Sequence, residues 1–148
     1  MKLGDWTVCR LDRKTRQILG VHHDKYNDYY AIEDNEYDIK EYDRLHHHWT
    51  IEDAEDGDIL ATDSGRPFVF KGCFDKSYPS SPVAYCGINI SDDFRACNAL
   101  NRWTAENVHP ATEEQRELLF KKMREDGYEW ISEKGLHKIE DYIQEKPY

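Results

Sequence analysis

A chain of 148 residues is long enough to bury a core without disulfides or metals, and its formal net charge of −10 disfavours direct binding to a nucleic-acid backbone. Ten tyrosines and four tryptophans favour β-rich packing. No apolar run is as long as a signal peptide or a membrane span requires, so we expect a soluble, cytoplasmic protein.

Residues 1–48 contain short apolar segments separated by polar turns. Apolar residues alternate around Trp6 and Val8, and further strands are expected in RQILGVHH, YYAIED and EYDIKEYDRLHHHW. Short strands joined in this way are typical of a small SH3-like barrel or a meander. We therefore expect a first domain over residues 1–48 that is a small, barrel-like β module.

Residues 49–148 predict a second domain. Thr50 and Asp53 have the spacing of a capping box, which can start one helical turn. ILATDSGRPFVFKG predicts a hairpin, VAYCGINI and FRACNAL predict two more strands, and YEWISEKGLHKI predicts a closing hairpin. Together with one helix, these strands indicate an α+β fold dominated by antiparallel β-structure.

One helix is predicted over residues 112–126. Thr112 is a good N-cap, Gln115 completes a capping box, and Gly127 is placed to end the helix in the left-handed conformation. The residues expected to face the sheet are Leu118, Leu119, Phe120 and Met123. Helix formation alone explains these residue types, so we interpret the helix as scaffold.

Patterns for catalysis, cofactors or metals are weak. The chain has no G-x-S-x-G, no G-x-x-x-x-G-K-[ST] and no G-x-G-x-x-G. Only His46 and His48 of the histidine run can point to one side of a strand, and neither has a partner at a known ligand spacing. The four cysteines (Cys9, Cys73, Cys86 and Cys97) are interpreted as small buried residues. We expect no enzyme activity, no cofactor and no metal, and a metal-dependent hydrolase using His46 and His48 is the second alternative function.

The best candidate for a binding surface is the acidic, tyrosine-rich stretch of the first domain. Eight acidic residues lie between Asp24 and Asp43, against Lys25 and Lys40. Such a surface can bind a basic partner, because complementary charge steers association. The residues expected to contact the partner are Asp34, Glu36, Tyr37, Asp38, Glu41 and Tyr42.

A second candidate is a small-ligand site made of arginine and aromatic side chains near turns. These residue types often stack on a ligand base or dominate an interface. The residues are Arg66, Phe68, Tyr85, Arg95, Arg102 and Trp103. Together they suggest a sponge for a nucleotide signal as the alternative function.

From residue 49 to residue 139 the chain resembles a recurrent domain of uncharacterised proteins from gut Bacteroidales and their phages and mobile elements. The motifs that carry the resemblance are WTIEDAEDGDIL, PFVFKG, VAYCGI, PATEEQRELLFKKMREDGYEW and LHKI. The GDW opening also looks like the small β module found in front of that domain. The resemblance implies an origin in a phage or mobile element and supplies no catalytic or ligand residues.

Accessory proteins of such elements frequently act by binding. We therefore expect a non-enzymatic inhibitor that uses its acidic surface against a basic host protein, one that handles nucleic acid or serves in defence. We expect no direct binding to nucleic acid or to a membrane.

Overall fold

The computed structural model describes residues 1–77, 81–89, 91–97, 108–131 and 134–139. The chain divides into two compact units, Met1–Asp53 (unit 1) and Ala54–Tyr148 (unit 2). The sequence placed this boundary between His48 and Trp49. Trp49 belongs to unit 1, where its backbone N–H donates to the Trp6 carbonyl at 2.8 Å.

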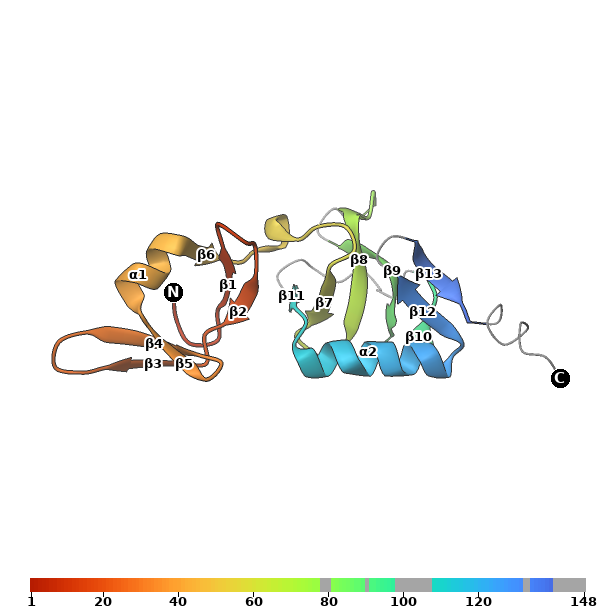
Figure 1. Ribbon diagram of the computed structural model, residues 1–148. Helices are drawn as coiled ribbons and strands as arrows, with labels where there is room; N and C mark the ends of the chain where they lie inside the picture. The colour runs from red at the N-terminus through yellow and green to blue at the C-terminus, as the bar shows by residue number, and fades with distance from the viewer. Residues whose placement is uncertain (78–80, 90, 98–107, 132–133, 140–148) are drawn as a thin grey trace. The chain divides into compact units, whose positions relative to one another are not determined.

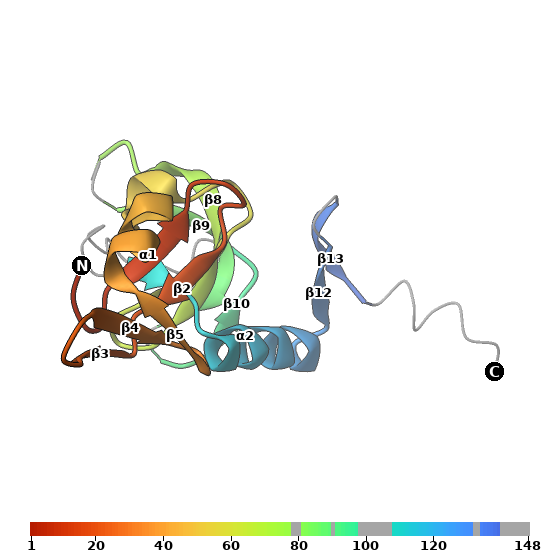
Figure 2. The same ribbon diagram turned by 60° about the vertical axis from the view of Figure 1, so that its left-hand side comes forward.

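Unit 1 contains two three-stranded antiparallel sheets, one short helix and a terminal 3-10 turn (Figures 1 and 2). The first sheet has the order β2-β1-β6 and the second the order β3-β4-β5. The elements are β1 (Trp6–Cys9), β2 (Thr15–Gln17), β3 (Gly20–His23), β4 (Asp28–Ile32), β5 (Asn35–Asp38), α1 (Ile39–Leu45), β6 (His46–His48) and η1 (Ile51–Asp53).

Helix α1 corrects the prediction of a continuous strand over EYDIKEYDRLHHHW and of a single helix in the chain. The Asp38 side chain caps this helix by accepting a hydrogen bond from the Glu41 backbone N–H at 3.1 Å. Ile39 and Tyr42 then lie three residues apart on the face that packs into the core. The alternation of Tyr37 and Ile39 suggested a strand, but the local capping bond favours the helix.

The core of unit 1 is built largely from tyrosine and isoleucine: Ile18, Tyr30, Ile32 and Tyr42, with Ile39 packed against them. Tyr30 and Tyr42 meet edge to face with ring centroids 5.5 Å apart. A hydrogen bond of 2.6 Å joins the Tyr42 hydroxyl to the Thr7 hydroxyl. Polar atoms of the core are thus paired with one another, as buried polar groups require.

The described residues of unit 2 form a five-stranded antiparallel sheet in the order β10-β9-β8-β7-β11, one helix and a two-stranded hairpin (Figure 1). Its elements are β7 (Ile59–Thr62), β8 (Pro67–Phe74), β9 (Pro82–Ile88), β10 (Phe94–Arg95), β11 (Val108–Pro110), α2 (Glu113–Glu125), β12 (Tyr128–Ile131) and β13 (Gly135–Lys138). The predicted hairpins β7–β8 and β12–β13 are confirmed. The β-dominated α+β class is confirmed as well.

Helix α2 has the predicted N-cap, and its bounds, Glu113–Glu125, lie one residue inside the predicted range 112–126 at each end. Thr112 and Gln115 form both hydrogen bonds of the capping box, and Gly127 follows the helix with φ 85°. Leu119 and Met123 are buried against the sheet, whereas Leu118 is exposed and does not join the inward face.

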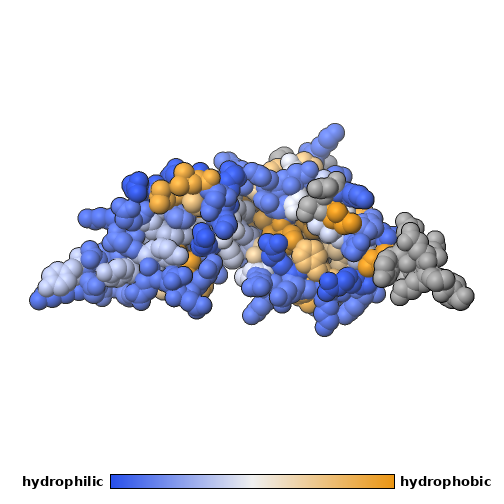
Figure 3. All heavy atoms as spheres, viewed as in Figure 1, coloured by the Kyte–Doolittle hydropathy of each residue, from blue (hydrophilic) through white to orange (hydrophobic). Residues whose placement is uncertain are grey.

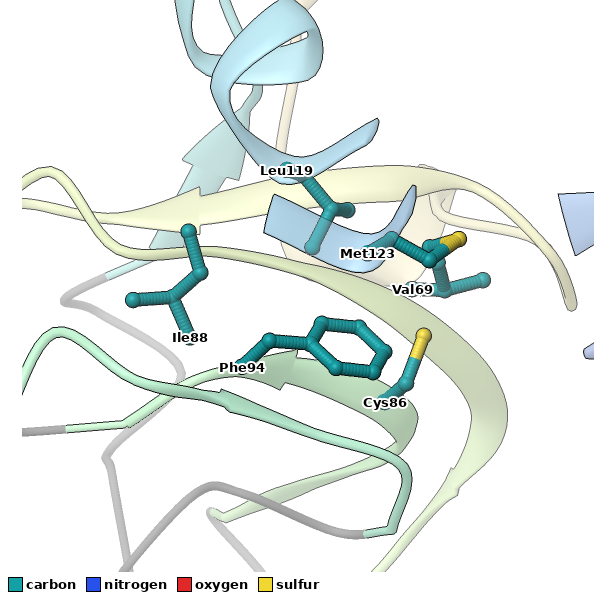
Figure 4. Packing of buried hydrophobic residues seen from close by; sticks show 6 residues of the cluster. All are labelled: Val69, Cys86, Ile88, Phe94, Leu119 and Met123. Carbon is teal, nitrogen blue, oxygen red and sulfur yellow. The ribbon is translucent and has the colours of Figure 1, made fainter. Parts of the chain in front are cut away.

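The core of unit 2 lies between α2 and the sheet. Figure 4 shows its six buried side chains directed toward one another: Val69, Cys86, Ile88, Phe94, Leu119 and Met123. Burial raises the pKa of the Cys86 thiol to about 12. Cys9 is buried too, but Cys73 and Cys97 are exposed, so the interpretation of all four cysteines as buried is wrong for these two.

Gly87 holds β9 close to β8. An added Cβ at this position would lie 2.7 Å from Cβ of Phe68, well inside van der Waals contact. Since Phe68 is fully buried, it cannot move aside into solvent. Only glycine fits at this position of β9, which is paired directly with Phe68 of β8.

Candidate functional site

The acidic stretch of the first domain forms the meander β3-β4-β5 and the start of α1. Its first turn is closed by Asp24, whose carboxylate accepts hydrogen bonds of 2.7 Å from the backbone N–H groups of Tyr26 and Asn27. These bonds, with that from Asn27 the largest cause, hold the pKa of Asp24 below its usual value. The second turn contains Glu33 in the left-handed conformation, with φ 55°. Two tight turns therefore bring the acidic residues onto one small sheet.

The register of the meander separates an inner face from an outer face. Val21, Tyr30 and Tyr37 are cross-strand neighbours, and Tyr30 belongs to the core. The next residues along the strands, which point the other way, include His22 and Glu36. Figure 3 shows a hydrophilic surface over β3, β4 and β5. The outer face is thus polar and open to a partner.

The exposed carboxylates make local ion pairs across the surface. Glu36 lies 3.3 Å from His22, and Glu41 lies 3.0 Å from Arg44. The side chains of Glu36 and Glu41 remain 62% and 68% exposed. Exposed pairs of this kind contribute about 0–1 kcal/mol to stability, so a partner can replace them at little cost.

The other residues predicted to contact a partner have different environments. Asp34 is exposed in the β4–β5 turn, and Tyr37 is at the rim of the core, where its ring is 5.5 Å from that of Tyr42. Asp38 caps α1. Tyr42 is only 3% exposed. Its ring is therefore part of the core and is not available to a partner.

Two tyrosine hydroxyls in unit 1 are held in the neutral form. Burial, followed by the hydrogen bond that Tyr30 donates to Asp43 at 3.0 Å, raises the pKa of Tyr30 to about 12. Burial also raises the pKa of Tyr42. These phenols therefore act as hydrogen-bonding core residues at neutral pH rather than as acids or bases.

The histidine run is engaged within unit 1. The His46 ring stacks on Tyr42, with centroids 3.7 Å apart and planes 2° apart, and its Nδ1 lies 2.9 Å from the Tyr42 carbonyl oxygen. His47 lies 3.0 Å from Asp53, and His48 lies 3.8 Å from Asp5. In the part of the chain that the structure describes, no group of three or more His, Cys, Asp or Glu residues is arranged to hold a metal ion.

The second predicted set does not converge on one site within the described residues. Phe68 is fully buried in unit 2. The Arg66 guanidinium donates to Ser64 Oγ at 2.7 Å and approaches Asp92 at 4.0 Å. Arg95 is exposed on β10. Arg102 and Trp103 lie outside the described residues.

Arg95 lines a shallow, highly charged recess of about 280 Å³ between the β9–β10 turn and the end of α2. The Lys122 ammonium donates to the Asp92 carbonyl there. The lining residues are Asp92, Asp93, Phe94, Arg95, Lys122, Glu125 and Asp126. This lining combines four carboxylates with two cations, so the recess does not present a single charge to a ligand.

Tyr85 has neighbours that the sequence did not indicate. The pairing of β8 with β9 shifts between Val69 and Phe70, and Tyr85 is the extra residue at this bulge. Its ring lies 5.2 Å from Trp130, with the Lys71 ammonium 5.6 Å above it. A hydrogen bond to Asp56 is the main cause that raises the pKa of Tyr85. A single-sequence pattern contains no signal for such a bulge.

Comparison with known proteins gives no match to a family model, to a curated protein or to a solved structure. Among the described residues, no helix has the length and apolar composition needed to cross a membrane.

Proposed function

We propose that the chain acts by binding, with exposed acidic side chains of the β3-β4-β5 meander and of α1 docking on a basic surface of another protein. One observation carries this proposal: carboxylates outnumber cationic groups on this surface and are largely exposed. Eight acidic residues lie between Asp24 and Asp43. The cationic residues of this stretch are Lys25 and Lys40, and Arg44 follows directly after it.

The chemistry of the surface selects the class of partner. Proteins that bind nucleic acid carry basic surfaces, because they neutralise phosphates with lysine and arginine. An acidic protein of this kind competes for such a surface through complementary charge. The proposed target is therefore a nucleic-acid-handling protein, and a host defence protein is the example that the phage-like resemblance favours.

The test compares charge reversals on the two units. The acidic-surface variant carries Asp34→Lys, Glu36→Lys and Glu41→Lys, and it keeps Asp38 because that residue caps α1. The matched control carries Asp63→Lys, Glu117→Lys and Glu125→Lys, which are exposed residues of unit 2 and change the net charge equally.

Each variant is immobilised and exposed to a lysate of cells that naturally carry the gene. Wild type and the unit 2 control should retain the same basic protein at low salt and release it as salt rises, because salt screens exposed charges. The acidic-surface variant should lose it. Retention of that protein by the acidic-surface variant would overturn the proposal.

A further inference from the structure

Strand β3 forms an open edge of the acidic sheet. In the order β3-β4-β5 it pairs with β4, while α1 packs against β4 and β5 (Figures 1 and 2). An edge strand is a template on which another extended chain can pair through its backbone.

The side chains of β3 lack the features that usually protect an edge strand from pairing with another chain. Natural edge strands are often protected by lysine, proline or inward-pointing charge. The segment from Leu19 to His23 contains no lysine, no proline and no acidic residue. Leu19 and Val21 are 58% and 37% exposed, and they lie two residues apart. They therefore present an apolar row on one side of the edge.

A third aliphatic side chain belongs to the same region. The Gly4 backbone N–H donates to the Ile18 carbonyl at 2.8 Å, which ties the N-terminal segment beside the residue before Leu19. Leu3, which precedes Gly4, is 62% exposed. A neighbouring segment thus brings a third exposed aliphatic residue close to the start of the edge.

The opposite side of the edge is acidic. The Glu36 carboxylate reaches across β4 to lie 3.3 Å from His22 on β3, close to the open edge. Over the whole meander, Lys25 is the only lysine or arginine among six acidic residues. Those acids are Asp24, Asp28, Glu33, Asp34, Glu36 and Asp38.

Charge decides between two possible occupants of this edge. A second copy of the chain would bring the same acidic meander against itself, and each copy has a net charge of −10. Like charges brought together oppose association. A basic segment would instead be attracted to the edge.

We propose that β3 receives an extended segment of the partner protein as a fourth strand of the β3-β4-β5 sheet. The segment alternates apolar and basic residues: the apolar side chains pack on Leu19 and Val21, and the basic ones reach toward Glu36. Four paired residues would span about 13 Å. This inference rests on the proposed function and specifies how the partner is held.

The probe is a blocked peptide in which lysine and valine alternate, Lys-Val-Lys-Val-Lys-Val-Lys. The matched control peptide has the same composition in block order, Lys-Lys-Lys-Lys-Val-Val-Val, so that its charge is equal but its valines cannot all lie on one side of a strand. Binding to the full chain is measured by calorimetry, and the site by amide chemical shifts and amide hydrogen exchange.

The variants place a lysine on the edge. Val21→Lys and Leu19→Lys each add a charge where the apolar row lies, and Leu11→Lys adds the same charge to the β1–β2 turn, where Leu11 is exposed. Circular dichroism and thermal melting establish that each variant is folded. Having two edge variants keeps the test decisive if one of them fails to fold.

The expected result is that the alternating peptide binds more tightly than the block peptide and protects from exchange the amides of β3 that point to the open edge. Each edge variant should weaken binding about tenfold, which corresponds to one lost valine-sized contact, and Leu11→Lys should not.

Three results would overturn the inference. The first is equal binding of both peptides with no effect of Val21→Lys. Binding would then depend on charge only, and the proposed function would still hold without strand pairing at β3. The second is no binding of the alternating peptide. The third is a dimer of the free chain that Val21→Lys dissociates, which would make a second copy the occupant. Failure of the proposed function is seen separately, as capture that survives charge reversal at Asp34, Glu36 and Glu41.

Discussion

Unit 1 and unit 2 are stabilised by different kinds of core. In unit 2 the helix α2 and the sheet bury aliphatic and aromatic side chains around Leu119 and Met123. In unit 1 the corresponding centre is a group of tyrosines whose hydroxyls are paired, as in the bond of 2.6 Å between Thr7 and Tyr42. The stability of the unit 2 core depends on the volume of its packed side chains, whereas that of the unit 1 core depends on hydrogen bonds as well. The two units should therefore be destabilised by different substitutions and conditions.

The surfaces of the two units also differ in polarity. On the face shown in Figure 3, apolar side chains gather on unit 2 over β7, β8 and β9, whereas β3, β4 and β5 of unit 1 present a polar surface. In unit 2 the charged residues at the ends of α2 match the helix dipole, with Glu113 and Glu114 in the first turn and Lys122 and Arg124 in the last. In unit 1 the charge is concentrated on the meander, which is why we place the binding function there.

The largest effect is expected from a cavity in unit 2. Leu119→Ala removes a fully buried side chain and should lower the free energy of unfolding of unit 2 by about 2–5 kcal/mol. Its neighbour Leu118 is 39% exposed, so Leu118→Ala should cost much less. Urea unfolding followed by the amide signals of each unit measures both variants. Equal losses for the two leucines would contradict the assignment of the inward face of α2.

An intermediate effect is expected from alkaline pH in unit 1. The pKa of Tyr30 is raised from 10.0 to about 12, so its neutral phenol stabilises the folded state below pH 10, and this contribution is lost as the pH rises from 10 to 12. Wild type should lose roughly 2 kcal/mol more than Tyr30→Phe over this range.

The control for this experiment is Tyr26→Phe, which removes an exposed phenol and should keep the alkaline loss of wild type. The measurement is urea unfolding of unit 1 at a series of pH values. If Tyr30→Phe loses as much stability as wild type, the alkaline sensitivity does not come from the buried phenol.

How much of the fold the sequence predicts depends on how local its causes are. Helix α2 was predicted correctly because Thr112, Gln115 and Gly127 determine its ends within a few residues. Helix α1 is the opposite case: Asp38 and Glu41 have the N-cap spacing, but the alternation of Tyr37 and Ile39 favours a strand, and the sequence alone does not decide between the two.

The candidate surface shows the same limit. The exposure of Glu36 and Glu41 follows from their charge and needs no structure. The burial of Tyr42 does not follow from its neighbours, since it depends on Thr7, which is 35 positions away. The sequence also does not predict that β3 lies at the edge of its sheet, because strand order depends on the folded structure.

The smallest effect on stability is expected on the surface to which we assign the function. Glu36→Gln removes an exposed ion pair with His22 and should change the free energy of unfolding of unit 1 by less than about 0.5 kcal/mol. The same substitution should weaken capture of the basic partner, whereas Glu117→Gln on α2 should affect neither quantity. Because a residue retained for the fold must cost stability when it is neutralised, a loss for Glu36→Gln comparable to that for Leu119→Ala would identify the carboxylate as structural. A loss of binding with the stability unchanged would separate the two roles, since the core of unit 1 would then fold without the acidic surface that the partner requires.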